Sequence, residues 1–314
     1  MKKLTKKLTS NIKVVGVGGS GGNAISRMKK SKIKGIELIA INTDYQDLKK
    51  IKADVKLRIG KKISQGLGAG MKPQIGELAA RESSDRIYDS LKGADMIFIT
   101  GGLGGGTGSG ASPVIAQIAK KIGALTVVIA TMPFSFEGIY RTKIAEASRR
   151  LLQQKVDALL VIQNDRLLHC LDPTTSLSNA FWLCDDILRE AVKGISDLIM
   201  LPRIVNVDFA DVKSILKNSG SVLFGMGKSK GEKRALEATT LALNSPLLNI
   251  KPKGAKGVLF NVSGGEDISL FEIEEIGNLI TREINPKAKV VFGAVQDEQL
   301  KKGEIKVTVI VTGF

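Results

Sequence analysis

The 314-residue sequence has few aromatic residues, two cysteines and one histidine. Because 43% of the residues are nonetheless hydrophobic, a sizeable core can be buried, which excludes a disordered or collagen-like chain. The cysteines, Cys170 and Cys184, suit a reducing cytosol and are too few for a disulfide framework or a metal set. A Ser-His-Asp hydrolase and a histidine-ligated zinc site both depend on imidazole groups, so His169 alone disfavours either interpretation.

Long hydrophobic runs are missing as well. The N-terminus carries Lys2, Lys3, Lys6 and Lys7, as a secretory signal would, but the apolar run that follows at 14–17 has only four residues. No stretch reaches the roughly 18–20 uncharged residues that a membrane-spanning helix requires. We therefore expect a cytoplasmic protein.

Basic residues outnumber acidic ones by 47 to 31, so the net charge is +16 and the isoelectric point is about 9.7. Such a balance is typical of proteins that contact nucleic acid or an anionic membrane. The lysines are spread along the chain and aromatic residues do not interleave with them, so no specific nucleic-acid partner is expected. A solvated surface explains the excess, and a weak contact with an anionic membrane is the alternative.

The first half of the sequence alternates short β-branched apolar segments with helical stretches, a pattern typical of a parallel sheet covered by helices. We expect strands at Lys13–Val17, Ile36–Ile41, Met96–Thr100, Leu125–Thr131 and Ala158–Ile162. A long helical pattern then runs from Asn179 to about Met200 and ends before Pro202.

The remainder indicates a second, smaller mixed α/β unit. Its expected strands are Val222–Gly225, Gly257–Val262, Val290–Val295 and Lys306–Val311, and its expected helices are Asp211–Ser219, Lys233–Ala242 and Leu270–Ile284. The predicted fold class is therefore α/β. A basic tail (1–12) precedes a parallel-sheet domain (13–177), and a long central helix (178–201) joins that domain to the smaller one (202–314).

A glycine-rich segment, Gly16-Val17-Gly18-Gly19-Ser20-Gly21-Gly22-Asn23, follows the first expected strand and precedes a helix. Glycines there let the backbone approach a phosphate, and the helix N-terminus supplies amide donors and a favourable dipole. The spacing also satisfies the dinucleotide fingerprint of NAD-dependent oxidoreductases, in which Glu37 or Asp44 would be the acid on the ribose. This segment alone does not identify the nucleotide.

A second segment, from Thr100 to Gly110, again follows an apolar strand and precedes an expected helix, Ala111–Lys121. Seven of the ten residues 101–110 are glycine, which indicates contorted backbone, close approach or both, since each glycine costs conformational entropy on folding. Successive N–H groups can form an anion-binding concavity beside the hydroxyls of Thr107 and Ser109. Two phosphate cradles at the carboxyl ends of parallel strands predict a polyphosphate that lies across the sheet edge.

A third segment with glycines, Gly225-Met226-Gly227-Lys228-Ser229, is similar to the end of a Walker A loop. Val222 stands where the first glycine of such a loop is required. We therefore interpret the segment as a turn.

The segment Gly104-Gly105-Gly106-Thr107-Gly108-Ser109-Gly110 resembles the signature of the tubulin/FtsZ family, with Ser109 where threonine is usual. The resemblance extends from Lys13 to Phe314 and is closer to FtsZ, the bacterial-type division GTPases, than to the longer tubulins. Further matching segments are Ile41–Asp44, Gly66–Gly70, Pro133–Gly138, Asn206–Val212 and Val307–Phe314. The resemblance implies that 13–177 is a GTP-binding domain and that 202–314 is a GTPase-activating domain.

The resemblance also implies which residues hold the GTP phosphates. They would be Gly19, Ser20, Gly21, Gly22, Asn23, Gly104, Gly105, Gly106, Thr107 and Gly108. Thr107 would lie at the β/γ end beside Mg²⁺, which the nucleotide rather than the protein would mainly hold. Glu137 and Arg141, four residues apart after Pro133, would share one helical face and contact ribose and phosphate. The alternative for this pair is an ordinary surface ion pair worth about 0.3–0.5 kcal/mol.

For the base, the resemblance implies that Phe181 stacks on guanine, that Asp185 accepts its N–H donors and that Asn164 contacts it as well. Core packing is the alternative for Phe181. The family commonly has one Asn and one Asp where this sequence has Asp185-Asp186, a departure that bears on base discrimination.

Asp208 and Asp211, three residues apart before an apolar helical run, fit an N-cap and its N3 partner. In the family this loop enters the GTP site of the adjacent subunit, where the two carboxylates polarise the attacking water, a contribution of roughly 10²–10⁴-fold in rate. Hydrolysis of GTP to GDP would then require head-to-tail contact, a heterologous interface that gives filaments. The resemblance thus implies an assembly-dependent GTPase of the cell division ring.

The partners implied by the resemblance are further copies of the chain and the membrane-anchoring and regulatory division proteins. Pro202-Arg203 replaces the usual Pro-Gly pair, which would stiffen the entry to the catalytic loop. The sequence ends at Phe314, without the linker and peptide that recruit membrane anchors. Either it is a piece of a longer chain, or the protein reaches the membrane another way, for which the N-terminal lysines are one candidate.

Two other functions compete with this interpretation. A nicotinamide-dependent oxidoreductase would leave the second glycine segment and the Asp208–Asp211 segment unexplained. A scaffold with this fold and little turnover is the non-enzymatic alternative, and the presence of all the expected phosphate-binding and carboxylate residues disfavours it.

Overall fold

The computed structural model describes residues 10–33, 35–168, 171–200, 203–205, 207–245, 247–248, 254–297 and 300–313. Expectations that concern the N-terminal lysines, His169, Cys170, Pro202, Asn206 and Phe314 lie outside the described residues.

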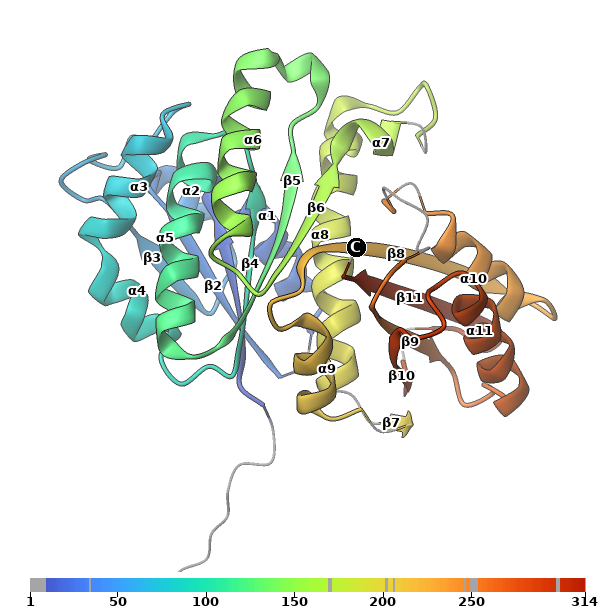
Figure 1. Cartoon of the computed structure of the whole chain (residues 1–314). Coiled ribbons are helices and arrows are strands. Elements are labelled where there is room, and N and C mark those ends of the chain that lie inside the picture. Colours follow the sequence, from blue (N-terminus) through green and yellow to red (C-terminus); the bar gives the residue numbers. More distant parts are fainter. Residues whose placement is uncertain are drawn as a thin grey trace, which may run out of the picture.

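Across the described residues the strands form one 11-stranded sheet in the order β3-β2-β1-β4-β5-β6-β8-β11-β9-β10-β7 (Figure 1). The N-terminal strands are β1 (Ile12–Val17), β2 (Ile36–Asn42), β3 (Val55–Arg58), β4 (Met96–Gly102), β5 (Leu125–Met132) and β6 (Ala158–Gln163). These six strands are all parallel. β1 and β5 are buried along their whole length, as expected for strands covered on both faces. The predicted parallel sheet is confirmed.

Helices cover both faces of the parallel part, as the layers in Figure 1 show. On one face, apolar side chains of α3 (Pro73–Glu82), α4 (Ser84–Leu91), α5 (Gly106–Ile122) and α6 (Ile139–Gln153) pack in one core. On the other face, α1 (Gly18–Lys30) and the long helix α8 (Leu177–Met200) pack in a second core. The short helices are α2 (Tyr45–Lys50), η1 (Ser135–Glu137) and α7 (Asn164–Leu168).

The C-terminal strands continue the same sheet, because β8 pairs in parallel with β6 through Leu160 and Val222. They are β7 (Arg203–Val205), β8 (Gly220–Lys230), β9 (Gly257–Gly264), β10 (Lys289–Gln296) and β11 (Glu304–Thr312). α10 (Arg234–Leu243) and α11 (Leu270–Arg282) cover one face with an apolar core, and α9 (Phe209–Leu216) follows β7. Helix α8 lies between the N-terminal and C-terminal parts (Figure 1).

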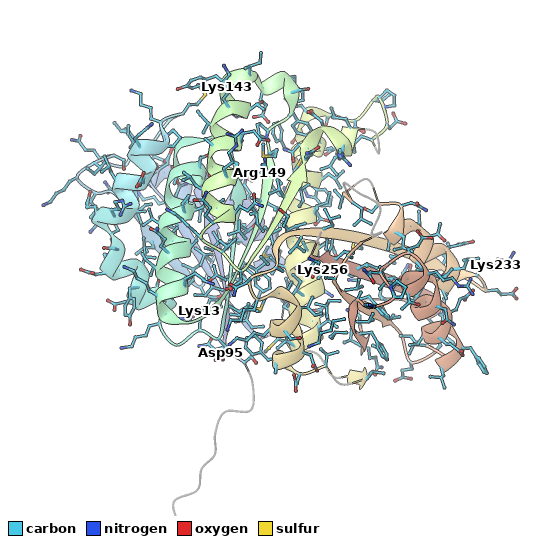
Figure 2. All side chains as sticks on the ribbon, viewed as in Figure 1. Lys13, Asp95, Lys143, Arg149, Lys233 and Lys256 are labelled. Carbon is cyan, nitrogen blue, oxygen red and sulfur yellow. The ribbon has the colours of Figure 1, made fainter. Side chains whose placement is uncertain are left out.

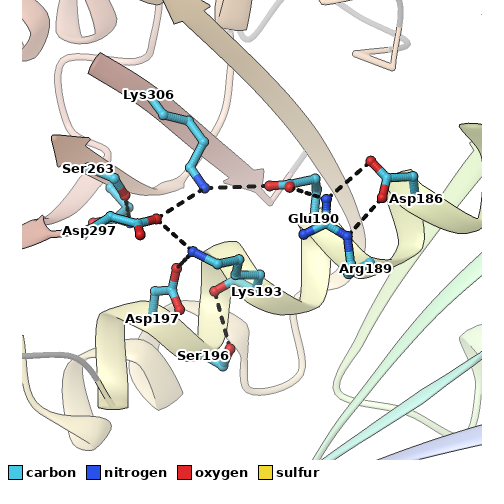
Figure 3. Close-up of polar contacts among 10 residues, drawn as sticks. Asp186, Arg189, Glu190, Lys193, Ser196, Asp197, Ser263, Asp297 and Lys306 are labelled. Atoms are coloured by element: carbon cyan, nitrogen blue, oxygen red, sulfur yellow. Dashed lines mark hydrogen bonds and ion pairs between the residues drawn. The ribbon is translucent and has the colours of Figure 1, made fainter. Parts of the chain in front are cut away.

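A chain of alternating charges joins α8 to the C-terminal strands (Figure 3). The Nζ atom of Lys193 lies 2.8 Å from Oδ2 of Asp197 on the same helix and 2.7 Å from Oδ2 of Asp297, just after β10. Lys306 of β11 lies 3.5 Å from Glu190 and 4.0 Å from Asp297. The same chain continues from Glu190 through Arg189 to Asp186. These ion pairs add to an apolar contact, because side chains of α8 also share a core with Phe224, Leu259 and Ile310 of the C-terminal strands. On the other face, α10 and α11 contact the sheet through apolar side chains.

The structure corrects two predictions about glycine segments. Residues 225–229 are not a turn but lie inside β8, where Gly225 and Gly227 let α10 approach: a Cβ atom on them would lie 2.1 Å from the Ala242 carbonyl oxygen and 2.0 Å from that of Ala238. The helix expected from Ala111 begins five residues earlier, at Gly106. In both places tertiary packing overrides the local preference of glycine for turns.

Basic side chains are spread over the surface. Figure 2 shows Lys143 and Arg149 on α6, far from Lys233 at the start of α10. No helix in the described part of the chain is both long and apolar enough to span a bilayer.

Candidate functional site

A cleft of about 610 Å³ opens at the carboxyl ends of β1 and β4. This is where the strand order of the sheet reverses, the usual place for a nucleotide in an open α/β sheet. Most of the residues predicted to bind GTP line it: Gly19, Ser20, Asn23, Gly105, Gly106, Thr107, Gly108, Glu137, Arg141, Asn164, Phe181 and Asp185. Gly21, Gly22 and Gly104, predicted with them, are not among the lining residues.

The first glycine segment is the beginning of α1, which starts at Gly18 directly after β1. Gly21 serves packing, because a Cβ atom there would lie 2.5 Å from the carbonyl oxygen of Thr100 on β4. A Cβ atom on Gly22 would likewise lie 2.9 Å from the side chain of Ile51. Gly18, Gly19 and Ser20 of the same turn line the cleft. The N-terminus of α1 thus directs its N–H groups and the positive end of its dipole into the cleft.

The second glycine segment runs from the end of β4 into the first turns of α5, which points its N-terminus at the same cleft. Gly106 and Gly110 allow α5 to lie against the backbone of residues 69–77, since Cβ atoms on them would come within 2.6 Å of the Gly70 carbonyl oxygen and 1.9 Å of that of Pro73. Gly104 has a φ of +104°, and its N–H donates to Oγ of Ser109 at 2.8 Å. Ser109, where threonine is usual, thus orients the turn before the helix.

Residues at the end of β2 and just after it also line the cleft, and the predicted set of GTP-binding residues omitted them. Oγ1 of Thr43 lies 2.6 Å from Oγ1 of Thr107, which holds the Thr107 hydroxyl at the edge of the cradle. Asn42 donates to Asp47 at 2.9 Å, and Asp44 and Asp47 line the cleft. Their position at the carboxyl end of a parallel strand next to β1 was the signal that could have found them.

Glu137 and Arg141 form an ion pair at 2.5 Å, but not on one helical face as predicted. Glu137 ends η1, and Gly138, with φ of +98°, separates it from α6, which contains Arg141. Glu137 also accepts from the N–H of Phe134 at 2.9 Å, so its carboxylate is fixed on two sides. Both residues line the cleft, as predicted for a pair that contacts a ligand there.

An aromatic and an amide group lie at the end of the cleft nearest α8. Phe181 is 38% exposed and meets the ring of Phe134 edge-on, with centroids 5.4 Å apart, so one of its faces is not used in the core. Asn164, which directly follows β6 and begins α7, is 4% exposed, and its Oδ1 atom has no hydrogen-bond partner. A buried acceptor without a partner is costly, which fits a ligand donor at this point.

Asp185 lies beside these two residues and is held from behind by α1. Its Oδ1 accepts from Ser20 and its Oδ2 lies 3.4 Å from Nη2 of Arg27. Burial raises the pKa of the Asp185 carboxyl to about 6, against the lowering effect of Arg27. The neighbouring Asp186 does not face the cleft but bonds to Arg189 at 2.8 Å (Figure 3). The Asp-Asp pair therefore places one carboxylate, not two, beside Phe181 and Asn164 in the cleft.

Comparisons with known proteins agree with this geometry. The model of the Tubulin/FtsZ family, GTPase domain, matches residues 11–172, and that of the FtsZ family, C-terminal domain, matches residues 220–314. The chain belongs to the FtsZ family. A solved structure described as an empty FtsZ dimer from M. jannaschii is 46% identical over 98% of this chain and 89% of that one, with a TM-score of 0.94.

More distant relatives share the fold of this FtsZ family member. A GTPgS-bound protofilament of CetZ2 from Haloferax volcanii is 21% identical over 96% of this chain and 93% of that one, with a TM-score of 0.78. A GDP-bound monomer of CetZ1 from the same organism is 23% identical over 97% and 94%, with a TM-score of 0.83. Membership of a GTPase family implies GTP and GDP binding and GTP hydrolysis.

Of the two acids of the oxidoreductase alternative, Glu37 does not reach the cleft of this FtsZ family member. Glu37 lies near the amino end of β2, where it pairs with Lys13 at 2.9 Å. Asp44 lines the cleft, but its carboxylate accepts from the N–H of Asp47 as the N-cap of α2.

Asp208 and Asp211 lie away from the cleft and form a capping box at the start of α9. Asp208 accepts from the N–H of Asp211 at 2.8 Å, and Asp211 accepts from that of Asp208 at 3.4 Å. After α9, Ser219 bonds to the carbonyl oxygen of Asp157, at the amino end of β6. The cleft residue Asn164 is at the carboxyl end of the same strand, roughly 20 Å away at 3.3 Å per residue. Figure 1 likewise shows α9 and α7 at opposite ends.

The cleft offers oxygen ligands for a metal ion but no full set. Among the described residues, no group of three or more His, Cys, Asp or Glu side chains gathers. Mg²⁺ bound to nucleotides characteristically takes one or two protein oxygens, phosphates and several waters. The hydroxyl of Thr107 and the carboxylates of Asp44 and Asp47 in the cleft fit that partial role.

Proposed function

We propose that this protein hydrolyses GTP to GDP at a site shared between adjacent subunits of a head-to-tail filament, and that such filaments form the cell division ring in the cytoplasm. The observation that carries the proposal is the separation of the two halves of the site. The phosphate cradles open at the carboxyl ends of β1 and β4, whereas Asp208 and Asp211 lie at the other end of the molecule. Only another copy of the chain can bring them together.

The cleft would bind the nucleotide through its own backbone. The N-termini of α1 and α5 direct N–H groups and helix dipoles at the phosphates. Thr107 would bind the terminal phosphate and Mg²⁺, which when bound would neutralise developing charge on the phosphates. Glu137 and Arg141 would orient the ribose and phosphate, and Phe181, Asn164 and Asp185 would hold guanine. In this assignment the carboxylates of Glu137 and Asp185 are occupied with the ribose and the base, so neither is assigned to the attacking water.

The carboxylates of the next subunit would supply that base. In the capping box each of Asp208 and Asp211 uses one oxygen, and the other oxygen of each would accept from a water. Positioning and general-base assistance would accelerate hydrolysis roughly 10²–10⁴-fold. Because the interface is heterologous, assembly continues into a filament. The empty dimer of the M. jannaschii FtsZ supports self-association.

The decisive experiment mixes two inactive variants. Asp211→Asn keeps the cleft but loses the carboxylate. Gly105→Glu keeps the loop but puts a negative charge into the phosphate cradle, where a Cβ atom on Gly105 meets open space. With GTP and Mg²⁺, each variant alone should be nearly inactive and the mixture should recover activity, since a complete site forms between unlike subunits. A mixture no more active than its components would refute the shared site.

Concentration dependence gives a second measurement. The rate per wild-type subunit should be near zero below a threshold concentration and rise above it. A rate that is flat with concentration would mean that each monomer is a complete enzyme.

Membrane-anchoring and regulatory division proteins would be the other partners. A weak contact with anionic membrane would appear as co-sedimentation with vesicles that depends on their content of anionic lipid.

A further inference from the structure

Arg27 has contacts that GTP binding by the cleft does not explain. It lies on α1, behind the cleft, and its Nη2 atom is 3.4 Å from Oδ2 of Asp185. Its guanidinium carbon lies 5.1 Å from the ring centroid of Trp182, and its Nε atom is buried without a hydrogen-bond partner. A guanidinium with five donors is therefore engaged by one loose ion pair and one aromatic face.

The carboxylate of Asp185 is in turn incompletely satisfied. An ionised carboxylate has about four lone-pair sites. In this structure Oδ1 is contacted by Ser20 and Oδ2 by Arg27, both at 3.4 Å and both from α1. Asp185 also lines the cleft, so its remaining lone pairs are directed at the space beside Phe181. Guanine presents two adjacent donors, N1–H and the N2 amino group, which such a pair of lone pairs can accept.

We propose that Arg27 is a positioning residue for guanine recognition: from behind the cleft it keeps the Asp185 carboxylate charged and turned toward the base. This inference rests on the proposed function, because it concerns the same site. It differs from that function in assigning a role to a residue that does not line the cleft.

The surroundings of Asp185 make this cation necessary. The other charged or titratable groups near it are Cys184 and Asp186 on α8 and Glu137 of η1. Asp186 raises the pKa of the Asp185 carboxyl, and burial raises it more, to about 6. Arg27 opposes both effects. Without Arg27, the carboxyl of Asp185 would stay protonated up to a higher pH. A protonated carboxyl is a poorer acceptor for the two guanine donors.

The experiment compares the binding of GDP and of inosine diphosphate, which lacks the N2 amino group, as a function of pH. Both ligands end in the same phosphate, which titrates in this pH range, so its effect cancels when their affinities are compared. Trp182, the one tryptophan of the chain, lies against Arg27 and provides the fluorescence signal. For wild-type protein, the preference for GDP should be full above about pH 7 and fall as the pH decreases through about 6.

Three variants separate the proposal from a packing role. Arg27→Met keeps the stem over Trp182 but loses the charge, so the pH at which the GDP preference falls should move upward by about one unit or more. Arg27→Lys should retain the wild-type midpoint. Arg149→Met, which breaks a more exposed ion pair with Glu146 on α6, should leave binding unchanged. Melting curves verify that each variant is folded.

The proposal is overturned if Arg27→Met weakens the binding of GDP and of inosine diphosphate by the same factor at every pH. It is also overturned if Arg27→Lys behaves like Arg27→Met. A wild-type protein that binds GDP with no preference over inosine diphosphate at any pH would instead refute base recognition by Asp185. Failure of wild-type protein to bind either nucleotide would refute the proposed function itself.

Discussion

Replacing Lys193 by methionine should be among the most destabilising changes available in this protein. The Lys193 side chain is 6% exposed and lies between the carboxylates of Asp197 and Asp297, which are 4% and 7% exposed (Figure 3). Methionine has a similar shape but no charge, so two buried carboxylates lose the cation between them. Breaking a buried pair in this way costs about 3–5 kcal/mol, against about 5–15 kcal/mol for the stability of a whole domain.

The assay is urea unfolding, in which the midpoint should fall while the slope stays constant. Lys228→Met is the matched control. Its partner is Glu304 at 2.9 Å, but the lysine side chain is 49% exposed, so the loss should be within about 1 kcal/mol. A Lys193→Met variant that loses no more than this control would refute the reasoning, because the chain of charges would then be as well solvated as a surface pair.

The pH dependence of the loss gives an independent test. Burial already raises the pKa of Asp197 in the presence of Lys193, which lowers it, and removal of the lysine must raise it further. An acid whose pKa is higher in the folded state than in the unfolded state destabilises the fold at high pH and ceases to do so as it protonates. The deficit of the variant should therefore be largest at neutral pH and shrink at mildly acidic pH. A deficit that grows on acidification would contradict the assignment.

Two further changes test the glycine packing and the capping box. Gly110→Ala should cost about 1–3 kcal/mol in urea unfolding, since the new Cβ atom would lie 1.9 Å from the Pro73 carbonyl oxygen, and Gly105→Ala, which meets open space, is its control. Asp208→Ala should lose about 1 kcal/mol by removing the N-cap of α9, whereas Asp208→Asn should retain that stability; equal losses would argue against the cap.

The position of the site could be predicted from the sequence because its signals are local. β-branched runs such as Leu125–Thr131 define strands wherever both faces are buried, and the observed β5 differs by one residue. Glycine segments that directly follow β1 and β4 then mark the carboxyl edge of the sheet. Since parallel strands all end at that edge, neighbouring strand ends necessarily form a common site.

The helical start of α5 could not be predicted from the same glycines. Each glycine costs about 1 kcal/mol in a helix relative to alanine, so local propensity places the segment in a loop. The cost is offset by packing that appears only in three dimensions, as when Gly76 of α3 lies against the carbonyl oxygen of Gly106. Gly225 and Gly227 in β8 were misinterpreted for the same reason.

Long-range ion pairs leave no pattern in the sequence. Arg27 and Asp185 are 158 positions apart, and Lys193 and Asp297 are 104 apart. Nothing in the spacing or the neighbours of either residue indicates its partner, because the pairing depends on how α1 and the C-terminal strands pack against α8. The positioning role proposed for Arg27 therefore required the structure.

The two aspartates before α9 illustrate why a structural role and a catalytic role do not exclude each other. A capping box needs one oxygen from Asp208 and one from Asp211, and the observed bonds use Oδ1 of the first and Oδ2 of the second. These bonds also fix the two side chains on the first turn of a helix, which limits how far their remaining oxygens can move. Asp208 is exposed and Asp211 is half-buried, and α9 lies at the opposite end of the molecule from α7, which begins at the cleft residue Asn164 (Figure 1). This fixed pair of carboxylates cannot reach the cleft of its own subunit by local motion. If it acts on GTP, it must act on the GTP of a neighbour, which is why the mixture of two inactive variants is the experiment that decides the mechanism.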